Sequence, residues 1–233
     1  MPIIALIPAR GGSRRIPNKN LADCLGKPLL QWTIEAAKDS NLIDRIILST
    51  DSPTIAEIGK QLGAEVPFIR PSSLAQTNTL MVPVMQHALR SLQQNGCVVD
   101  TLVLLQPTQP LRQGRHIDEA LSIFSSTNSA TVVSVVETPH IYNPDILHRI
   151  RNNRLVPYLG TEQNNRQESS HEKIFARNGP AILINKSIVI ELGKKFGDPL
   201  TPYIMSRDCS IDIDEPLDLF LAECMLRRRF GLL

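Results

Sequence analysis

The sequence of 233 residues is poor in cysteine, and its four cysteines stand far apart. Cys24, Cys97, Cys209 and Cys224 form no CxxC pair, so neither a zinc site nor a disulfide framework is indicated. The five histidines also lack HxxxH or HExxH spacing, which argues against a histidine-based metal site. These absences favour a cytoplasmic protein.

Long apolar runs and a strong net charge are absent as well. No stretch approaches the ~20 apolar residues that a membrane-spanning helix needs, and MPIIALIPAR at the N-terminus does not resemble a signal peptide. The net charge is only +2, so we expect no broad surface for nucleic acid or for membranes. The positive charge is local, which favours a small anionic ligand.

Apolar runs of strand length alternate with longer segments of helical period. We expect strands at residues 3–8, 45–50, 66–71, 101–108 and 130–137, and helices at 28–40, 53–63, 81–96 and 114–126. This alternation predicts an α/β fold with a mostly parallel sheet and helices on both faces. Ligands bind such sheets at the carboxyl ends of the strands, so the loops after residues 8, 50, 70 and 106 should share one edge.

The alternation stops after Glu137. Residues 147–159 predict two strands around an Asn-Asn turn, and a very polar stretch follows them at 160–173. The α/β pattern then returns with a strand within 178–185, a helix at 187–196, a short strand (YIMS), the extended segment SIDID and a last helix from Pro216. We therefore predict a single domain over 1–233 with an insertion at about 138–177.

The loop after the first strand, IPARGGSRRIPNKN at 7–20, carries four cations around Gly11-Gly12. Glycine lets the backbone approach a phosphate, and arginine and lysine supply charge-assisted hydrogen bonds to its oxygens. The spacing is neither the P-loop GxxxxGK[ST] nor the dinucleotide GxGxxG. The charge spacing alone favours a triphosphate site and a solvated basic turn about equally.

Two aspartates alternate in SIDID at 210–214, so Asp212 and Asp214 should lie on the same side of an extended segment. Two converging carboxylates can hold Mg²⁺ through their oxygens. For Asp214 the alternative is helix capping, because Asp214 or Glu215 can cap the helix that begins at Pro216. Capping does not explain Asp212, so the pair favours a metal.

The motif A9-R10-x-x-S13-R14-x-I16-P17-x-K19-N20, together with RPSSLA, LLQPTQPLR and SIDID, resembles the signature of the CMP-acylneuraminate synthetases and related cytidylyltransferases for 2-keto-3-deoxy sugar acids. The resemblance spans residues 7–223. It implies a three-layer Rossmann-like nucleotidyltransferase fold whose small insertion serves dimerisation. The chain departs from the family pattern at Arg14, Gln109 and Pro180, where the family usually has lysine, serine and alanine.

The resemblance also implies roles for individual residues. The implied nucleotide-binding residues are Arg10, Gly12, Ser13, Arg14, Lys19, Asn20 and Arg70, and the implied sugar-acid-binding residues are Gln106, Thr108, Arg166, Gln167 and Arg177. Arg10 and Lys19 would act in catalysis with Asp212 and Asp214, which would hold Mg²⁺. Arg177 would reach the neighbouring active site of a homodimer.

The implied reaction transfers CMP from CTP to a sialic-acid-like sugar acid with release of pyrophosphate. Residues 140–150 lack the lysine that sialic-acid enzymes of this type tend to have, so neuraminic, legionaminic, pseudaminic and other ulosonic acids stay open. A sugar-1-phosphate nucleotidylyltransferase is the nearest alternative, but its GxGTR-like opening is absent. A non-catalytic nucleotide-binding protein is the other alternative, and it has less need of two converging carboxylates.

Overall fold

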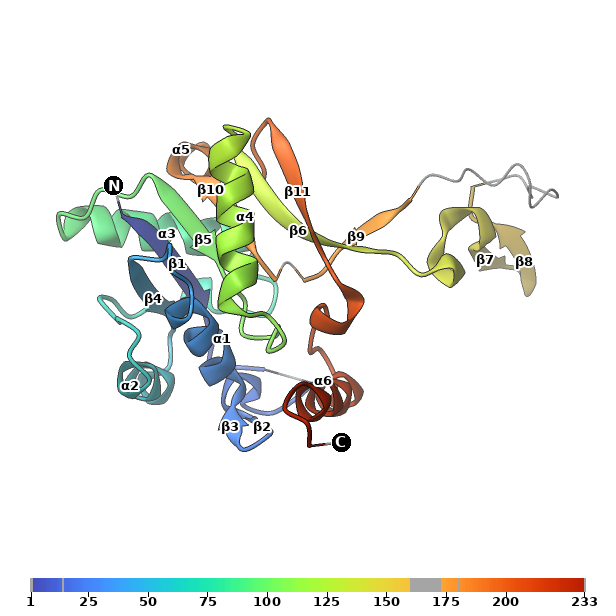
Figure 1. Cartoon of the computed structure of the whole chain (residues 1–233), viewed down its shortest axis with the longest axis horizontal. Coiled ribbons are helices and arrows are strands. Elements are labelled where there is room, and N and C mark those ends of the chain that lie inside the picture. Colours follow the sequence, from blue (N-terminus) through green and yellow to red (C-terminus); the bar gives the residue numbers. More distant parts are fainter. Residues whose placement is uncertain (1, 14, 160–172, 180, 233) are drawn as a thin grey trace.

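The computed structural model describes residues 2–13, 15–159, 173–179 and 181–232 (Figure 1). In this part of the chain seven strands form one sheet, in the order β11-β6-β10-β5-β1-β4, with β9 paired to β6. The strands are β1 (Ile3–Pro8), β4 (Arg45–Ser49), β5 (Thr101–Leu104), β6 (Thr131–Glu137), β9 (Phe175–Arg177), β10 (Leu183–Lys186) and β11 (Leu200–Met205). The pairs β1–β4, β1–β5 and β6–β11 are parallel, while β10 is antiparallel to both β5 and β6. The prediction of a mostly parallel sheet is confirmed.

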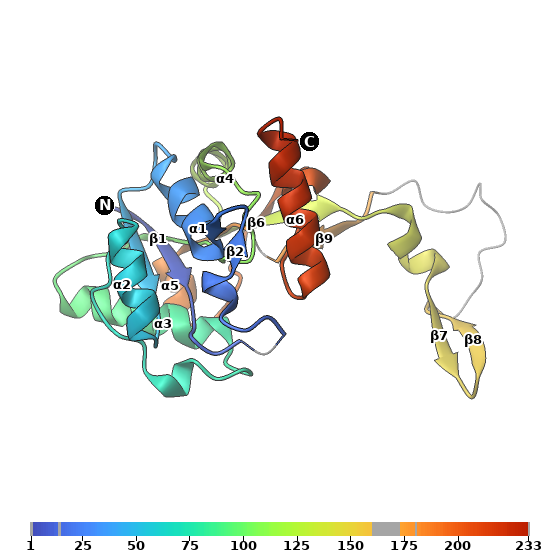
Figure 2. The same cartoon turned by 90° about the horizontal axis from the view of Figure 1, so that it is seen from below.

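Helices cover both faces of the sheet (Figures 1 and 2). The helices are α1 (Leu29–Lys38), α2 (Pro53–Gln61), α3 (Met81–Gln94), α4 (Gly114–Ser126), α5 (Ser187–Glu191) and α6 (Pro216–Arg229). Alternate residues of β1 point to opposite faces: Ala5 packs in one cluster with residues of α1, α2 and α4, and Leu6 packs in another with residues of α3. Both side chains are fully buried. The structure therefore has the three layers that the sequence predicted.

The helix α6 closes a third apolar cluster at the end of the molecule that carries the first loop. Leu226 of α6 packs there with Trp32 of α1 and Ile213 of the SIDID segment. Burial of each such side chain contributes about 1.5–3 kcal/mol. This cluster brings the last 25 or so residues of the chain against the first 30 or so, beside the two-residue strands β2 (Asp23–Cys24) and β3 (Lys27–Pro28).

The predicted strand at 66–71 is wrong. In the structure a single bridge joins Ile47 and Glu65, and the chain then crosses the strand ends as a loop. Pro67 and Pro71 lack the N–H that a sheet ladder needs, which explains the loss of strand structure. The loop is held by the Arg70 backbone N–H, which donates to the Thr50 carbonyl oxygen at 2.8 Å. The predicted strand 101–108 also ends early, at Leu104, before the two prolines of the following loop.

The insertion leaves the sheet at the end of β6 and projects as an arm (Figures 1 and 2). It contains two short 3₁₀ turns and the hairpin of β7 (His148–Arg151) and β8 (Arg154–Pro157). The two central hairpin residues, Asn152 and Asn153, have φ values of 50° and 58°, as a type I′ turn requires. The predicted Asn-Asn turn is confirmed. The last three residues of the predicted insertion form β9, which pairs with β6 in the main sheet.

None of the helices in the described residues is long and apolar enough to cross a membrane.

The start of α4 predicts a pH dependence of stability. His116 is buried, and its Nδ1 atom accepts a hydrogen bond of 3.1 Å from the Gln113 backbone N–H, which a protonated ring cannot accept. Burial first, and then the charge of Arg115, lowers the pKa of His116 from 6.5 to about 4. The unfolded chain therefore takes up the proton at a higher pH than the folded chain, and the free energy of unfolding falls as the pH drops from 6.5 towards 4.

We expect His116→Gln to flatten this dependence, because glutamine keeps an acceptor oxygen but does not titrate. Between pH 7 and pH 5 the wild-type protein should lose at most about 2 kcal/mol more than the variant, measured by urea unfolding. Equal losses in the two proteins would show that His116 does not control the acid side of the stability curve.

Candidate active site

A cavity of about 330 Å³ opens at the carboxyl ends of β1 and β5, where the sequence predicted the ligand. It brings together most of the predicted site residues from four separate segments of the chain. The predicted residues that line it are Arg10, Ser13, Lys19, Asn20, Arg70, Gln106, Thr108, Asp212 and Asp214. Their roles stay predictions, but the structure places them around one cavity.

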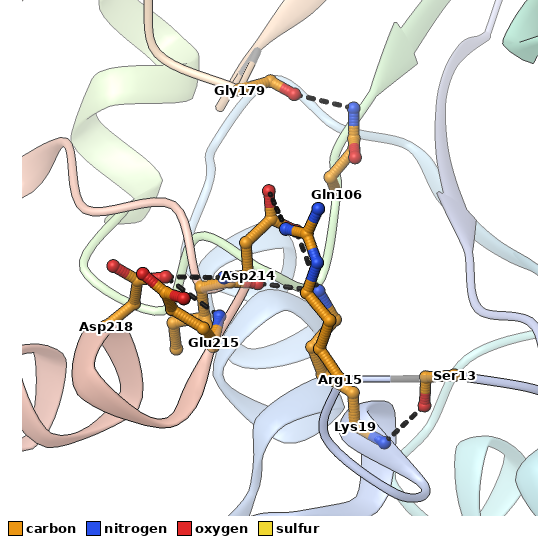
Figure 3. A network of polar contacts seen from close by, with 9 residues as sticks. Ser13, Arg15, Lys19, Gln106, Gly179, Asp214, Glu215 and Asp218 are labelled. Carbon is orange, nitrogen blue, oxygen red and sulfur yellow. Dashed lines mark hydrogen bonds and ion pairs between the residues drawn. The ribbon is translucent and has the colours of Figure 1, made fainter.

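The first loop and the SIDID segment meet at this cavity (Figure 3). Lys19 Nζ donates to the Ile213 carbonyl oxygen at 2.7 Å and lies 3.2 Å from Asp214 Oδ1. On the outer side, Arg15 Nη1 lies 3.6 Å from Asp214 Oδ2. Cations from the start of the chain thus neutralise a carboxylate from near its end, in the wall of the same cavity.

Side chains within the site hold the first loop in shape. Asn20 Nδ2 donates to the Arg10 carbonyl oxygen at 2.9 Å, and Ser13 Oγ accepts from the Lys19 backbone N–H at 2.8 Å. Asp51, which the sequence assigned to turn chemistry, accepts from the Gly11 backbone N–H at 2.9 Å. The loop is therefore ordered by the protein itself, with the charged ends of Arg10 and Lys19 left at the cavity.

Arg70 is almost fully buried and lies against the cavity. Its nearest acid is Asp51, 3.8 Å away, and among the described residues its Nε and Nη2 atoms have no hydrogen-bond partner. Burial lowers the pKa of Arg70, Asp51 opposes this effect and Arg10 adds to it. Buried donors without partners cost free energy, so a bound acceptor at the cavity would satisfy them.

Asp212 and Asp214 both line the cavity but differ in environment. Burial raises the pKa of Asp212 and the neighbouring Thr108 hydroxyl opposes this rise, while the negative charge of Asp214 adds to it. Thr108 Oγ1 itself makes no hydrogen bond of normal geometry within the described residues. Two carboxylates in one cavity favour a cation between or beside them, because it removes their mutual repulsion.

The structure does not support the alternative that Asp214 caps helix α6. The carboxylate of Asp218 accepts hydrogen bonds of 2.9 Å from the backbone N–H groups of both Asp214 and Glu215 (Figure 3). The N-cap of α6 is Glu215. The Asp214 side chain is therefore free of capping and faces the cavity and the cations of the first loop.

The donor set fits Mg²⁺. Within the described residues no group of three or more histidine, cysteine, aspartate or glutamate side chains is arranged around a common point. Asp212 and Asp214 would offer two carboxylates, and Mg²⁺ in nucleotide sites is usually held by one or two carboxylates together with phosphate oxygens and water. The all-oxygen chemistry matches that preference.

Gln109 and Gly179 support Asp212, and the sequence did not single them out as site residues. Gln109 Nε2 donates to the Asn178 carbonyl oxygen at 2.7 Å, and Gln106 Nε2 donates to the Gly179 carbonyl oxygen at 2.8 Å. Gly179 has a φ of 100°, and a Cβ atom there would clash with Gln109 Nε2 and would lie 2.8 Å from Asp212 Oδ2. The Asn-Gly dipeptide before a strand was the available signal, since it marks positive φ.

Some predicted residues lie elsewhere. Gly12 is exposed and does not line the cavity. Arg177 is exposed on β9, with its guanidinium 5.1 Å from the Phe196 ring, and does not reach the cavity of its own chain. Arg14, Arg166 and Gln167 lie outside the described residues. Residues missed by the prediction include Gln76, Thr77 and Thr79, which line the cavity from the polar run after Arg70.

A three-layer α/β sheet with a cationic loop and paired carboxylates at its strand ends defines a protein of the nucleotidyltransferase class. The sequence model of the cytidylyltransferase family matches residues 4–223, so the chain belongs to this family. The family and the fold predicted from the sequence are both confirmed.

The relatives include nonulosonic-acid enzymes. The CMP-N,N'-diacetyllegionaminic acid synthase of Legionella pneumophila is 35% identical over 229 residues, which are 97% of each chain. The pseudaminic acid cytidylyltransferase of Campylobacter jejuni is 29% identical over 229 residues, again 97% of each chain. The solved CMP:2-keto-3-deoxy-manno-octonic acid synthetase, complexed with CTP, covers 98% of this chain and 100% of its own with a TM-score of 0.71. At 14% identity it supports the fold alone.

The contact of Gly179 with Asp212 leads to a prediction about catalysis. Gly179→Ala should lower turnover, measured as pyrophosphate release from CTP, by about 10²-fold or more, because the added methyl group displaces the side chains of Gln109 and Asp212. Gly96→Ala is the matched control, since Gly96 also has a positive φ (76°) but a Cβ there meets nothing within 4 Å. Equal turnover in the two variants would show that the position of Asp212 does not depend on Gly179.

Proposed function

We propose that this protein transfers CMP from CTP to the anomeric hydroxyl of a nonulosonic acid and releases pyrophosphate. The observation that carries the proposal is the contact of Lys19 with Ile213 and Asp214, which joins a cationic loop to an acidic segment in one cavity. A nucleoside triphosphate with a divalent cation needs both: positive charge for the phosphates and carboxylates for the cation. The two relatives, which are named for legionaminic and pseudaminic acid, supply the class of acceptor.

The proposed role of each residue follows from its charge and its position in the cavity. Arg10, Ser13 and Lys19 bind the phosphate chain and stabilise the charge that develops on the leaving pyrophosphate. The buried Arg70 donates its free N–H groups to the nucleotide. Asp212 and Asp214 would hold Mg²⁺, which would supply Lewis-acid chemistry for the transfer.

The acceptor side of the cavity is built on the loop after β5. Gln106 and Thr108 line the cavity there, and the Gln106 amide is anchored on the Gly179 carbonyl oxygen at 2.8 Å. An anchored side chain can orient the sugar acid for in-line attack on the α-phosphorus, and positioning of this kind lowers the barrier without covalent chemistry. Among the acids we place N,N'-diacetyllegionaminic acid first, because the enzyme named for it is the more similar of the two relatives.

A substrate panel tests the reaction. Pyrophosphate release from CTP and Mg²⁺ should appear with one or more of N,N'-diacetyllegionaminic, pseudaminic and N-acetylneuraminic acid. Release with sugar 1-phosphates alone would instead support a sugar-1-phosphate nucleotidylyltransferase. A thermal shift with CTP and Mg²⁺ but no release with any acceptor would support a nucleotide-binding protein without activity.

The metal role of Asp212 has a separate test. Asp212→Asn should lower turnover by about 10²-fold or more, while the calorimetric affinity for CTP in EDTA changes little, because the carboxylate acts through the cation. Asp39→Asn removes an exposed carboxylate outside the cavity and should leave both quantities unchanged. Near-normal turnover of Asp212→Asn would contradict the metal assignment.

We further propose that the arm makes the protein a homodimer. Ile150 and Leu155 face each other across the hairpin and are 75% and 72% exposed, and Ile141 and Tyr142 are exposed nearby along the arm. Exposed apolar side chains in this number on one projection are typical of an interface. A second copy covering the arm would also bring Arg177 near another cavity.

The double variant Ile150→Glu/Leu155→Glu should shift the protein from dimer to monomer in sedimentation velocity. Arg151→Glu, on the opposite face of β7, is the control and should stay dimeric. A wild-type protein that sediments as a monomer would refute the dimer.

A further inference from the structure

A second charged cavity, of about 340 Å³, lies between the start of α4 and the end of α6. It shares no lining residue with the active-site cavity. Among its lining residues are three arginines, Arg115, Arg228 and Arg229, and one acid, Asp208. We call it the α4–α6 cavity.

The placement of these arginines is not explained by helix stability alone. Arg228 and Arg229 stand in the last turn of α6, where a cation is favoured by the helix dipole. Arg115 stands in the first turn of α4, where a cation is disfavoured. Arg115 donates a hydrogen bond of 3.0 Å to the Gln113 amide oxygen and lies 3.7 Å from Glu119, and it remains exposed. Three guanidinium groups around one hollow, with one acid among them, leave an excess of positive charge.

The arginines also affect the pKa of a neighbouring buried side chain, that of His116. After the main effect of burial, Arg115, Arg229 and Arg112 all lower the pKa of His116, and Glu119 alone among its charged neighbours opposes them. A positive field that disfavours a protonated histidine favours a bound anion at the same place.

We propose that the α4–α6 cavity is a second anion site, which binds a small phosphate-class oxyanion. Guanidinium groups match phosphate oxygens in pairs, and a phosphate or pyrophosphate between α4 and α6 would relieve the repulsion among the three arginines. The cavity has about the same volume as the active-site cavity, so pyrophosphate fits it.

The cavity is connected to the active site through two loops. Arg229 Nη2 donates to the Leu111 carbonyl oxygen at 2.8 Å, and the next residue, Arg112, donates to the Gln106 and Ala181 carbonyl oxygens at 3.3 and 2.7 Å. On the other side, Asp208 and Cys209 of the cavity precede SIDID in the chain. Arg229 therefore contacts the loop that also carries Gln106, and Asp208 lies four residues before Asp212.

Calorimetry without turnover tests the site. Inorganic pyrophosphate is titrated into the protein in EDTA with saturating CTP, so the active site is filled and no reaction occurs. We expect a binding event whose affinity does not change when the CTP concentration is doubled. Arg115→Gln/Arg228→Gln should weaken this event at least tenfold, because it removes two of the three guanidinium groups.

The control variant Arg227→Gln/Lys60→Gln lowers the net charge equally at exposed positions outside the cavity, and it should bind pyrophosphate as the wild type does. Matching thermal melting curves without pyrophosphate will show that both variants fold. The proposal is overturned by the absence of a binding event with CTP bound, by an affinity that falls with added CTP, or by equal weakening in both double variants. None of these outcomes bears on the transferase activity, because no turnover is measured.

Discussion

The ammonium group of Lys19 joins the two ends of the chain, with a hydrogen bond of 2.7 Å to the Ile213 carbonyl oxygen and a contact of 3.2 Å with Asp214. Together with Arg15, 3.6 Å from Asp214, it balances the charge of the acidic segment against that of the cationic loop. The neighbouring apolar cluster of Trp32, Ile213 and Leu226 excludes water beside it and fixes α6 against α1. The charge contacts and the apolar packing thus favour the same arrangement of the two ends of the chain. The cavity forms because the first loop and the SIDID segment both line it.

A second cation, the buried guanidinium group of Arg112, holds the loop after β5 in place. Arg112 is almost completely buried, and its guanidinium donates to the Gln106 and Ala181 carbonyl oxygens and to Thr33 Oγ1. Burial lowers the pKa of Arg112 to about 9, so the side chain is still charged at neutral pH. Carbonyl oxygens, and not a carboxylate, stabilise this positive charge. The same hydrogen bonds fix the backbone of Gln106, which lines the cavity. Groups held in place before the substrate binds need no reorganisation during the reaction.

The strand β9 joins the arm to the main sheet and leads into a turn beside Asp212. β9 and β10 both run antiparallel to β6, and the Asn178–Gly179 turn lies between them, against Gln109 and Asp212. The backbone that returns from the arm through β9 therefore reaches the turn in which Gly179 lies beside Asp212. The proposed dimer interface on the arm and the turn beside Asp212 therefore lie on one stretch of the chain, on either side of β9.

Local sequence patterns were enough to predict much of the fold and the family. Apolar periodicity predicted the strands at 3–8 and 130–137 and the main helices, Asn152 and Asn153 predicted the hairpin turn, and the motifs around Arg10 and Asp212 indicated the family. Each of these signals is contained in a short window, because helix period, turn conformation and phosphate-binding loops depend on near neighbours. Only the tertiary structure decided that Lys19 meets Ile213 and Asp214, and that Gly179 must lack a side chain beside Gln109 and Asp212. These outcomes depend on atoms brought together from distant parts of the chain, and no local pattern encodes which of them will meet.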